Sequence, residues 1–85
     1  MMVPTIHLNG TSKEELLEQL QNAYTACTDL VSALSRAYPH GRDYYPQGDA
    51  AIYKAQDEAN DRVRRVRSVQ NELTEIAQKI QEENS

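Results

Sequence analysis

The feature that most constrains the fold is a seven-residue repeat of apolar side chains in the second half of the chain. The repeated residues are Ile52, Ala59, Val66, Leu73 and Ile80. Apolar residues follow three positions later at Ala55, Val69 and Ile76. Side chains with this spacing form one stripe along an α-helix, as in a coiled coil. The repeat predicts a helix over residues 49–82 that packs along its length on a second helix.

The first half of the chain predicts that second helix, over residues 12–38. Steps of three and four residues connect its inner apolar positions, which are Leu16, Leu20, Ala23, Cys27, Leu30, Leu34 and Ala37. A further apolar row beside them consists of Leu17, Tyr24, Val31 and Tyr38. The inner positions should pack on the other helix, so a two-helix hairpin would leave the further row facing water.

The remaining segments are short. Residues 3–8 place Ile6 and Leu8 on one face and predict a β-strand or extended arm, followed by a turn at Asn9 and Gly10. Residues 39–48 contain two prolines and two glycines and predict an ordered loop between the helices. We therefore expect one mainly α domain over residues 1–85, an antiparallel two-helix hairpin with a short N-terminal β-strand.

A hairpin of 85 residues buries little apolar surface, so we expect it to be completed by homo-oligomerisation. Two features support a dimer or a higher oligomer. One apolar row of the first helix would have no cover in a single copy, and the N-terminal strand would have no partner strand. The strand should pair with its counterpart in another copy, or lie as an arm across a neighbour's helices.

Composition excludes several classes of protein. The chain has 13 acidic and 9 basic residues and a net charge of −4, which disfavours binding of bulk DNA or RNA through overall charge. No apolar run is long enough for a membrane span or a secretory signal. The single cysteine, Cys27, cannot form an internal disulfide, in agreement with a reducing compartment. These observations favour a cytoplasmic location.

The sequence contains no pattern typical of catalysis. His7 and His40 lack the Cys, His or carboxylate spacing of a metal site, and no phosphate loop, dinucleotide fingerprint or nucleophile–base pair is present. Cys27 occupies a position in the inner row where a small apolar residue is wanted. We therefore expect a protein that is not an enzyme and needs no metal or cofactor.

The predicted loop is the first candidate for a binding site. Its chemistry-bearing residues are His40, Arg42, Tyr44 and Tyr45. Tyrosine offers a stacking face and a hydroxyl, and arginine offers a planar fork for phosphate or carboxylate. The alternative is structural: Tyr44 and Tyr45 would close the end of the helical core, and Arg42 would pair with Asp43 or a helix terminus.

A local basic segment is the second candidate, and its members are Arg62, Arg64, Arg65 and Arg67. Such a patch can hold an anion in an acidic protein. The alternative is an exposed helix face, because Glu58 and Asp61 stand four residues before Arg62 and Arg65 and could pair with them. Arg62 also falls in the predicted seam, where an apolar residue is expected.

The start of the first helix is the third candidate. Thr11 and Ser12 each have a glutamate three residues later, the spacing of a capping box, so a helix cap is the simplest role for this pair. Backbone N–H groups at the positive end of the helix, from Asn9, Thr11 and Ser12, could also bind an anion.

Residues 4–12 (PTIHLNGTS) and 39–46 (PHGRDYYP) resemble small proteins encoded by tailed bacteriophages. Size, helical build and expected oligomer are also similar to phage anti-defence sponges, which sequester the nucleotide signals of bacterial immune systems such as Thoeris and CBASS. This resemblance implies a protein of the bacterial host's cytoplasm that uses arginine and aromatic side chains between subunits to hold a cyclic nucleotide. It does not extend to a position-by-position match with a sponge's binding residues.

Two functional hypotheses follow. In the first, a phosphorylated nucleotide binds between subunits: Arg42, with Arg62 or Arg65, meets the phosphates, Tyr44 and Tyr45 stack on a base, and residues 9–12 supply backbone donors. In the second, the chain is a protein–protein inhibitor or adaptor of a host factor, as anti-CRISPR proteins are, or a small structural accessory of the virion. A loop in a concave cavity favours the first hypothesis, and a loop on a convex surface favours a protein partner.

Overall fold

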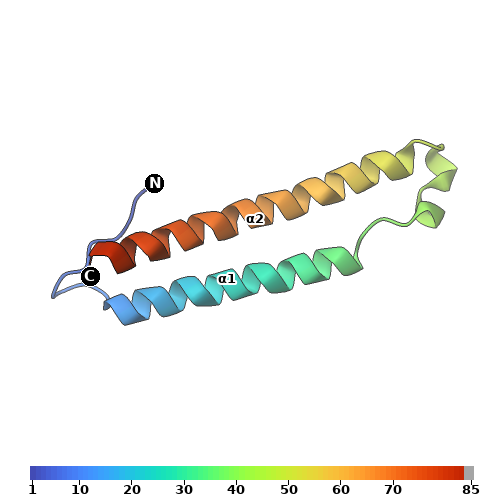
Figure 1. Ribbon diagram of the computed structural model, residues 1–85. Helices are drawn as coiled ribbons and strands as arrows, with labels where there is room; N and C mark the ends of the chain where they lie inside the picture. Colours follow the sequence, from blue (N-terminus) through green and yellow to red (C-terminus); the bar gives the residue numbers. More distant parts are fainter. Residues whose placement is uncertain (84–85) are drawn as a thin grey trace.

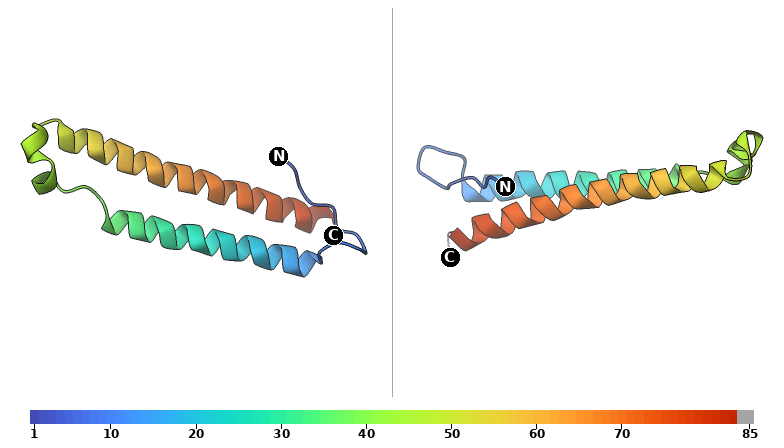
Figure 2. Two further views of the ribbon diagram at one scale, coloured as in Figure 1. Left: turned by 180° about the vertical axis from the view of Figure 1, so that it is seen from behind. Right: turned by 90° about the horizontal axis from the view of Figure 1, so that it is seen from above.

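The computed structural model describes residues 1–83 and shows two long helices packed side by side as an antiparallel hairpin (Figure 1). Helix α1 spans Lys13–Arg36 and helix α2 spans Ala51–Glu83. Two short 3-10 helices, η1 over Gly41–Asp43 and η2 over Tyr45–Gln47, connect them. The molecule is a rod of 61 × 19 × 18 Å, with the connection at one end, called the tip below, and the N-terminus and the last turn of α2 near the other, the open end (Figure 2).

The beginning of α1 follows from its capping residue. The Ser12 hydroxyl accepts a hydrogen bond from the Glu15 backbone N–H at 3.2 Å, and Glu14 and Glu15 lie in the first turn. A negative charge there interacts favourably with the helix dipole. At the other end, the Ala37 N–H bonds to the carbonyl of Ala33 at 3.1 Å, and Pro39 follows closely. The predicted cap at Ser12 is confirmed.

Replacing Ser12 by alanine is expected to lower the free energy of unfolding by about 1 kcal/mol, because the Glu15 N–H then loses its side-chain acceptor. Urea titration followed by circular dichroism measures this loss. Thr11→Ala is the matched control, since the cap hydrogen bond comes from its neighbour. An equal loss in the two variants would show that the Ser12 hydroxyl does not cap the helix.

The tip is an ordered connection of consecutive 3-10 turns. The Asp43 N–H bonds to the His40 carbonyl at 3.1 Å, and the Gln47 N–H bonds to the Tyr44 carbonyl at 2.9 Å. Gly48 has a φ of 106°, a conformation that residues with a Cβ rarely adopt, and it turns the chain into α2. Because α2 has 33 residues and α1 has 24, this connection has to bridge the stretch of α2 that extends past α1.

The face that α2 turns toward α1 differs from the predicted seam at three positions. Its buried or half-buried residues are Ile52, Ala55, Ala59, Val63, Val66, Gln70, Leu73, Ala77 and Ile80. Gln70 replaces Val69, which is 46% exposed, and Val63 replaces the predicted Arg62, which is exposed. Ala77 is half-buried beside the predicted Ile76, which is also half-buried. Residues three and four positions after a seam residue lie on its two sides, so the seam can step from one to the other. Here the step keeps the Arg62 charge in water.

The two apolar rows of α1 also differ from the prediction. Leu17 and Val31, from the row expected to face water, are half-buried together with Leu20 and Leu34. In contrast Ala23, Leu30 and Ala37 from the expected inner row are exposed, with Leu30 at 47%. Periodicity identifies an apolar face three positions wide but does not show which edge of it meets the partner helix. The prediction therefore holds only in part. Leu16, Leu20, Cys27 and Leu34 of the expected inner row are half-buried, and Tyr24 and Tyr38 of the other row are exposed, as predicted.

The predicted strand is not formed, and no strand exists anywhere in residues 1–83. Residues 1–7 instead run past the C-terminal end of α2 as an irregular arm, with Val3 and Ile6 half-buried (Figures 1 and 2). The predicted turn is confirmed, since the Gly10 N–H bonds to the His7 carbonyl at 3.1 Å. Leu8 lies in this turn and is 99% exposed, so it does not share a buried face with Ile6. A strand needs a second extended segment to pair with, and these residues offer none.

None of the helices that the structure describes is long and apolar enough to span a membrane.

Candidate functional site

The residues singled out from the sequence lie in three separate places. Asn9, Thr11 and Ser12 are at the open end of the rod, where the Ser12 hydroxyl serves as the cap of α1. His40, Arg42, Tyr44 and Tyr45 are at the tip, the opposite end of a molecule 61 Å long. Arg62 and Arg65 are on α2 between these ends. One copy of the chain cannot bring all of them to one small ligand.

The tip is the end of the rod that η1 and η2 form (Figure 1), and most of its polar and aromatic residues are exposed. Tyr44 is half-buried, whereas Tyr45 is 76% exposed and Tyr53, in the first turn of α2, is 68% exposed. Arg42 is exposed, and no carboxylate of residues 1–83 lies within 4 Å of its guanidinium group. Of the structural roles considered for these residues, burial at the end of the core therefore fits Tyr44 but not Tyr45, and the pairing of Arg42 is absent.

The four arginines of α2 differ in what they contact. Arg64 and Arg65 share the carboxylate of Asp61, at 3.4 and 3.0 Å. Arg67 donates to the Gln70 side-chain oxygen at 2.8 Å. Arg62 has no carboxylate within 4 Å among the described residues, so the expected pair with Glu58 is not formed. Arg62 and Arg67 are thus the members of the group without an ion pair among the described residues, and the Arg62 side chain also forms no hydrogen bond with them.

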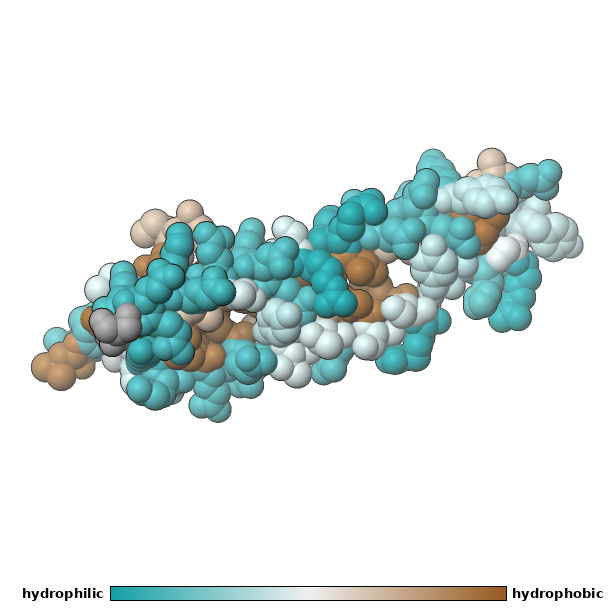
Figure 3. All heavy atoms as spheres, viewed as in Figure 1, coloured by the Kyte–Doolittle hydropathy of each residue, from teal (hydrophilic) through white to brown (hydrophobic). Residues whose placement is uncertain are grey.

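A hollow of about 690 Å³ lies where α1 ends and α2 continues alone. It is lined by Leu34, Ser35, Ala37, Tyr38, Ala59, Asn60, Arg62, Val63 and Arg64. Apolar side chains, one tyrosine ring and two guanidinium groups therefore meet at one place. Figure 3 shows apolar atoms open to solvent between the polar surfaces of the two helices.

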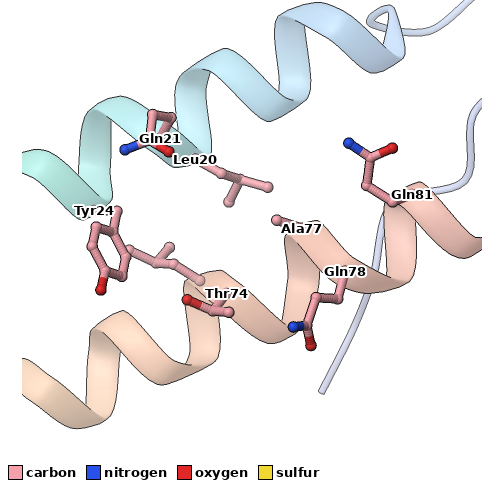
Figure 4. A pocket seen from close by; sticks show the side chains of 8 residues that line it. Leu20, Gln21, Tyr24, Thr74, Ala77, Gln78 and Gln81 are labelled. Atoms are coloured by element: carbon pink, nitrogen blue, oxygen red, sulfur yellow. The ribbon is translucent and has the colours of Figure 1, made fainter.

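A second, smaller hollow of about 280 Å³ lies between the helices nearer the open end (Figure 4). Leu20, Tyr24 and Ala77 lie around it, and the amides of Gln21, Gln78 and Gln81 stand at its rim. No charged side chain lines it, so it offers no group that would hold an anion. The short side chain of Ala77 leaves space beside Leu20, so imperfect packing between the helices accounts for this hollow.

Sequence reasoning included Arg62 among the ligand-binding residues and Arg64 in the basic segment, but it did not place Tyr38 or Asn60 beside them at the 690 Å³ hollow. A signal was present, because the second predicted helix is longer than the first. The part of the second helix that extends past the first is either exposed or covered by the loop. Residues near the end of the first helix then border the space beside it. Arg65 lines an adjacent groove instead.

Among residues 1–83, no three His, Cys, Asp or Glu side chains are close enough to hold a metal ion. Comparisons with protein-family models, with curated proteins and with solved structures find no match to this chain.

Proposed function

We propose that this chain is a non-enzymatic anti-defence protein of a tailed bacteriophage, which sequesters a phosphorylated or cyclic nucleotide signal in the cytoplasm of the bacterial host. It acts as a homo-oligomer. The observation that carries the proposal is the hollow of about 690 Å³ at the end of α1, where Tyr38 lies with two arginines, Arg62 and Arg64. Its size falls within the range of about 300–1,000 Å³ typical of small-molecule sites.

The chemistry of the lining suits a nucleotide. The guanidinium groups of Arg62 and Arg64 can hold phosphate oxygens, each through a fork of two N–H donors. The Tyr38 ring offers a stacking face for a base, and Asn60 and Ser35 offer polar groups for its edge or for a ribose. No carboxylate or imidazole lines this hollow, so its residues supply binding groups and no general base. This composition supports sequestration rather than turnover.

Replacing Arg62 by glutamine is expected to weaken nucleotide binding by tenfold or more. A hydrogen bond to a charged group contributes about 1.5–3 kcal/mol, and about 1.4 kcal/mol corresponds to a factor of ten in affinity. Calorimetric titration against a panel of cyclic and linear phosphorylated nucleotides measures this. Lys54→Gln, which removes the same charge from α2 outside the hollow, should bind as the original chain does.

Two results would contradict the proposal. The first is that the original chain takes up none of these nucleotides, either in titration or as a retained mass in native mass spectrometry. The second is that Arg62→Gln and Lys54→Gln bind equally well.

A second candidate function is that of an inhibitor or adaptor that docks on a host protein through the tip. The exposure of Tyr45 and Tyr53 at this end favours it, since tyrosine is a frequent anchor of protein interfaces. An intact protein that binds no nucleotide would leave this candidate as the better one.

A further inference from the structure

The two long sides of the hairpin differ in polarity. On one side, the residues that flank the seam are all polar: Gln21, Thr28 and Ser35 of α1, and Asn60, Arg67, Thr74 and Gln81 of α2. We call the other the apolar side, defined by Leu16, Ala23, Leu30 and Ala37 of α1 and by Val69 and Ile76 of α2. Arg62 and Glu83, at the same heptad position as Val69 and Ile76, are the charged members of that flank. The difference follows from helical spacing, because each set repeats every seven residues.

Part of the apolar side is open to solvent. Leu16 and Ile76, nearest the open end, are half-buried, and the arm of residues 1–7 passes this end of α2. Further along, Leu30 is 47% and Val69 46% exposed. A groove of about 420 Å³ lies between these two residues and is also lined by Leu34, Arg62, Arg65 and Val66. Ala26 and Ala33 extend the open surface along α1.

We propose that a second copy of this chain covers the apolar side, with the two hairpins antiparallel, so that the tip of each lies at the open end of the other. The product is a four-helix bundle in which α2 crosses over the partner's α2. An apolar face three positions wide in every heptad is the pattern of helices in such bundles, whereas a two-helix contact needs a narrower one.

Charge complementarity identifies the second copy as the occupant. Arg65 and Glu72 are seven residues apart, so they lie on the same flank of α2, one on each side of Val69. An antiparallel α2–α2 contact centred beside Val69 places Arg65 of one copy opposite the partner's Glu72, and the two-fold axis repeats the pair. Both groups can form this ion pair. Arg65 contacts Asp61 through its Nε, and Glu72 has no basic group within 4 Å among the described residues.

The same charges argue against a dimer with both tips at one end. That arrangement places α2 over the partner's α1, and Arg65 would need an acid on the apolar side of α1. The acidic residues of α1 are Glu14, Glu15, Glu18 and Asp29. None of them shares a heptad position with Leu30 or with Ala26. Only the antiparallel arrangement satisfies Arg65 and Glu72 together.

This arrangement has a consequence for the candidate residues at the ends of the rod. Each tip, with Arg42 and Tyr45, comes to the same end of the bundle as residues 9–12 of the partner. Groups that one copy holds at opposite ends of a 61 Å rod are then neighbours in the dimer. The dimer is inferred from the polarity and charges of the helix surfaces, and it does not depend on the ligand proposed above.

Measuring the oligomeric state tests whether a second copy covers the apolar side. Sedimentation velocity at micromolar concentration should show a dimer for the original chain and a monomer for Leu30→Glu, which places a charge in the middle of the proposed contact. Ser32→Glu, on an exposed position of α1 away from the apolar side, should remain a dimer. Circular dichroism should show that both variants stay helical. A monomeric original chain, or an undisturbed Leu30→Glu dimer, would overturn the proposal.

Charge reversal tests the orientation without an apolar substitution. Arg65→Glu and Glu72→Arg should each raise the dimer dissociation constant by tenfold or more, because each places like charges opposite one another twice per dimer. The double variant should return to within a few-fold of the original value. Arg64→Glu is the matched control, since Arg64 shares Asp61 with Arg65 and is as exposed, at 69% against 70%. A double variant that is not rescued would overturn the antiparallel arrangement.

These outcomes are separable from those of the proposed function. A dimer that takes up no nucleotide contradicts the ligand proposal and leaves the dimer standing. A monomer that binds nucleotide contradicts the dimer and the homo-oligomeric part of the proposed function, and leaves the ligand proposal standing.

Discussion

Replacing Ile80 by alanine is expected to lower the free energy of unfolding by about 2–4 kcal/mol, the range for removing a large aliphatic side chain from a core. Ile80 is 0% exposed, and the other buried apolar residues among those described are two alanines, Ala55 and Ala59. The largest apolar group fully removed from water is therefore at the open end of the hairpin. Truncating it removes a methylene and two methyl groups that were buried and leaves a cavity.

Ile52→Ala is the matched control for this prediction. Ile52 is the same residue type, lies in the first turn of α2 away from the apolar side, and is only half-buried, so its truncation should cost less than half as much. Urea denaturation followed by circular dichroism, at one fixed protein concentration, compares the variants. Equal losses would mean that the burial of Ile80 does not contribute more than an ordinary position at the helix surface.

The sequence predicted the hairpin because two long amphipathic segments joined by a short connection leave few other arrangements. The Ser12 cap was predictable for a local reason, since the hydroxyl and the N–H that it accepts from are three residues apart. Such features depend on neighbours in the chain. They do not depend on how the two helices are rotated about their axes.

That rotation is what periodicity left undetermined. Leu17 and Leu16 are adjacent in sequence and equally apolar, and so are Val31 and Leu30. A polar contact from the other helix accompanies the observed rotation, since the Gln70 amide bonds to Thr28 and to the Tyr24 carbonyl at 2.9 and 3.1 Å. A glutamine in a stripe of apolar residues gave no sign in the sequence that it would be buried.

The candidate site was less predictable than the fold. Residue types with binding chemistry were recognisable, but a helix turns sequence separation into distance at about 1.5 Å per residue. Residues 9–12 at the open end and Arg42 at the tip thus lie at opposite ends of a 61 Å rod, although the sequence analysis assigned them to one site. The 690 Å³ hollow arises from the difference in length between α1 and α2, which no single motif encodes.

Gln70 is expected to be a second position with a large effect. It is 2% exposed and is the one buried polar residue among those described. Its side-chain NH₂ donates to the Thr28 hydroxyl and the Tyr24 carbonyl, and its oxygen accepts from Arg67 at 2.8 Å. Gln70→Ala removes all three hydrogen bonds and leaves space in the seam, so it should cost about 1–3 kcal/mol.

Gln78→Ala is the control, because Gln78 is an exposed glutamine of the same helix and its truncation should change stability by less than about 0.5 kcal/mol. Urea denaturation of both variants measures the difference. If the two variants were equally stable, the hydrogen bonds of Gln70 would contribute nothing beyond those that water provides.

Gln70→Leu tests whether Gln70 determines the register of the two helices separately from its effect on the free energy of unfolding. Leucine fills the seam, the Tyr24 carbonyl keeps its partner within α1, and Arg67 can reach water, so this variant should match or exceed the original stability. A buried polar group at a seam position favours the one register in which it finds its partners, at a cost in stability. Without the bond to Thr28, α1 and α2 should slide between alternative registers. The expected sign is a doubled or broadened set of amide resonances in NMR spectra at unchanged helix content. A single sharp set would show that apolar packing alone fixes the register, and that Gln70 is dispensable for it.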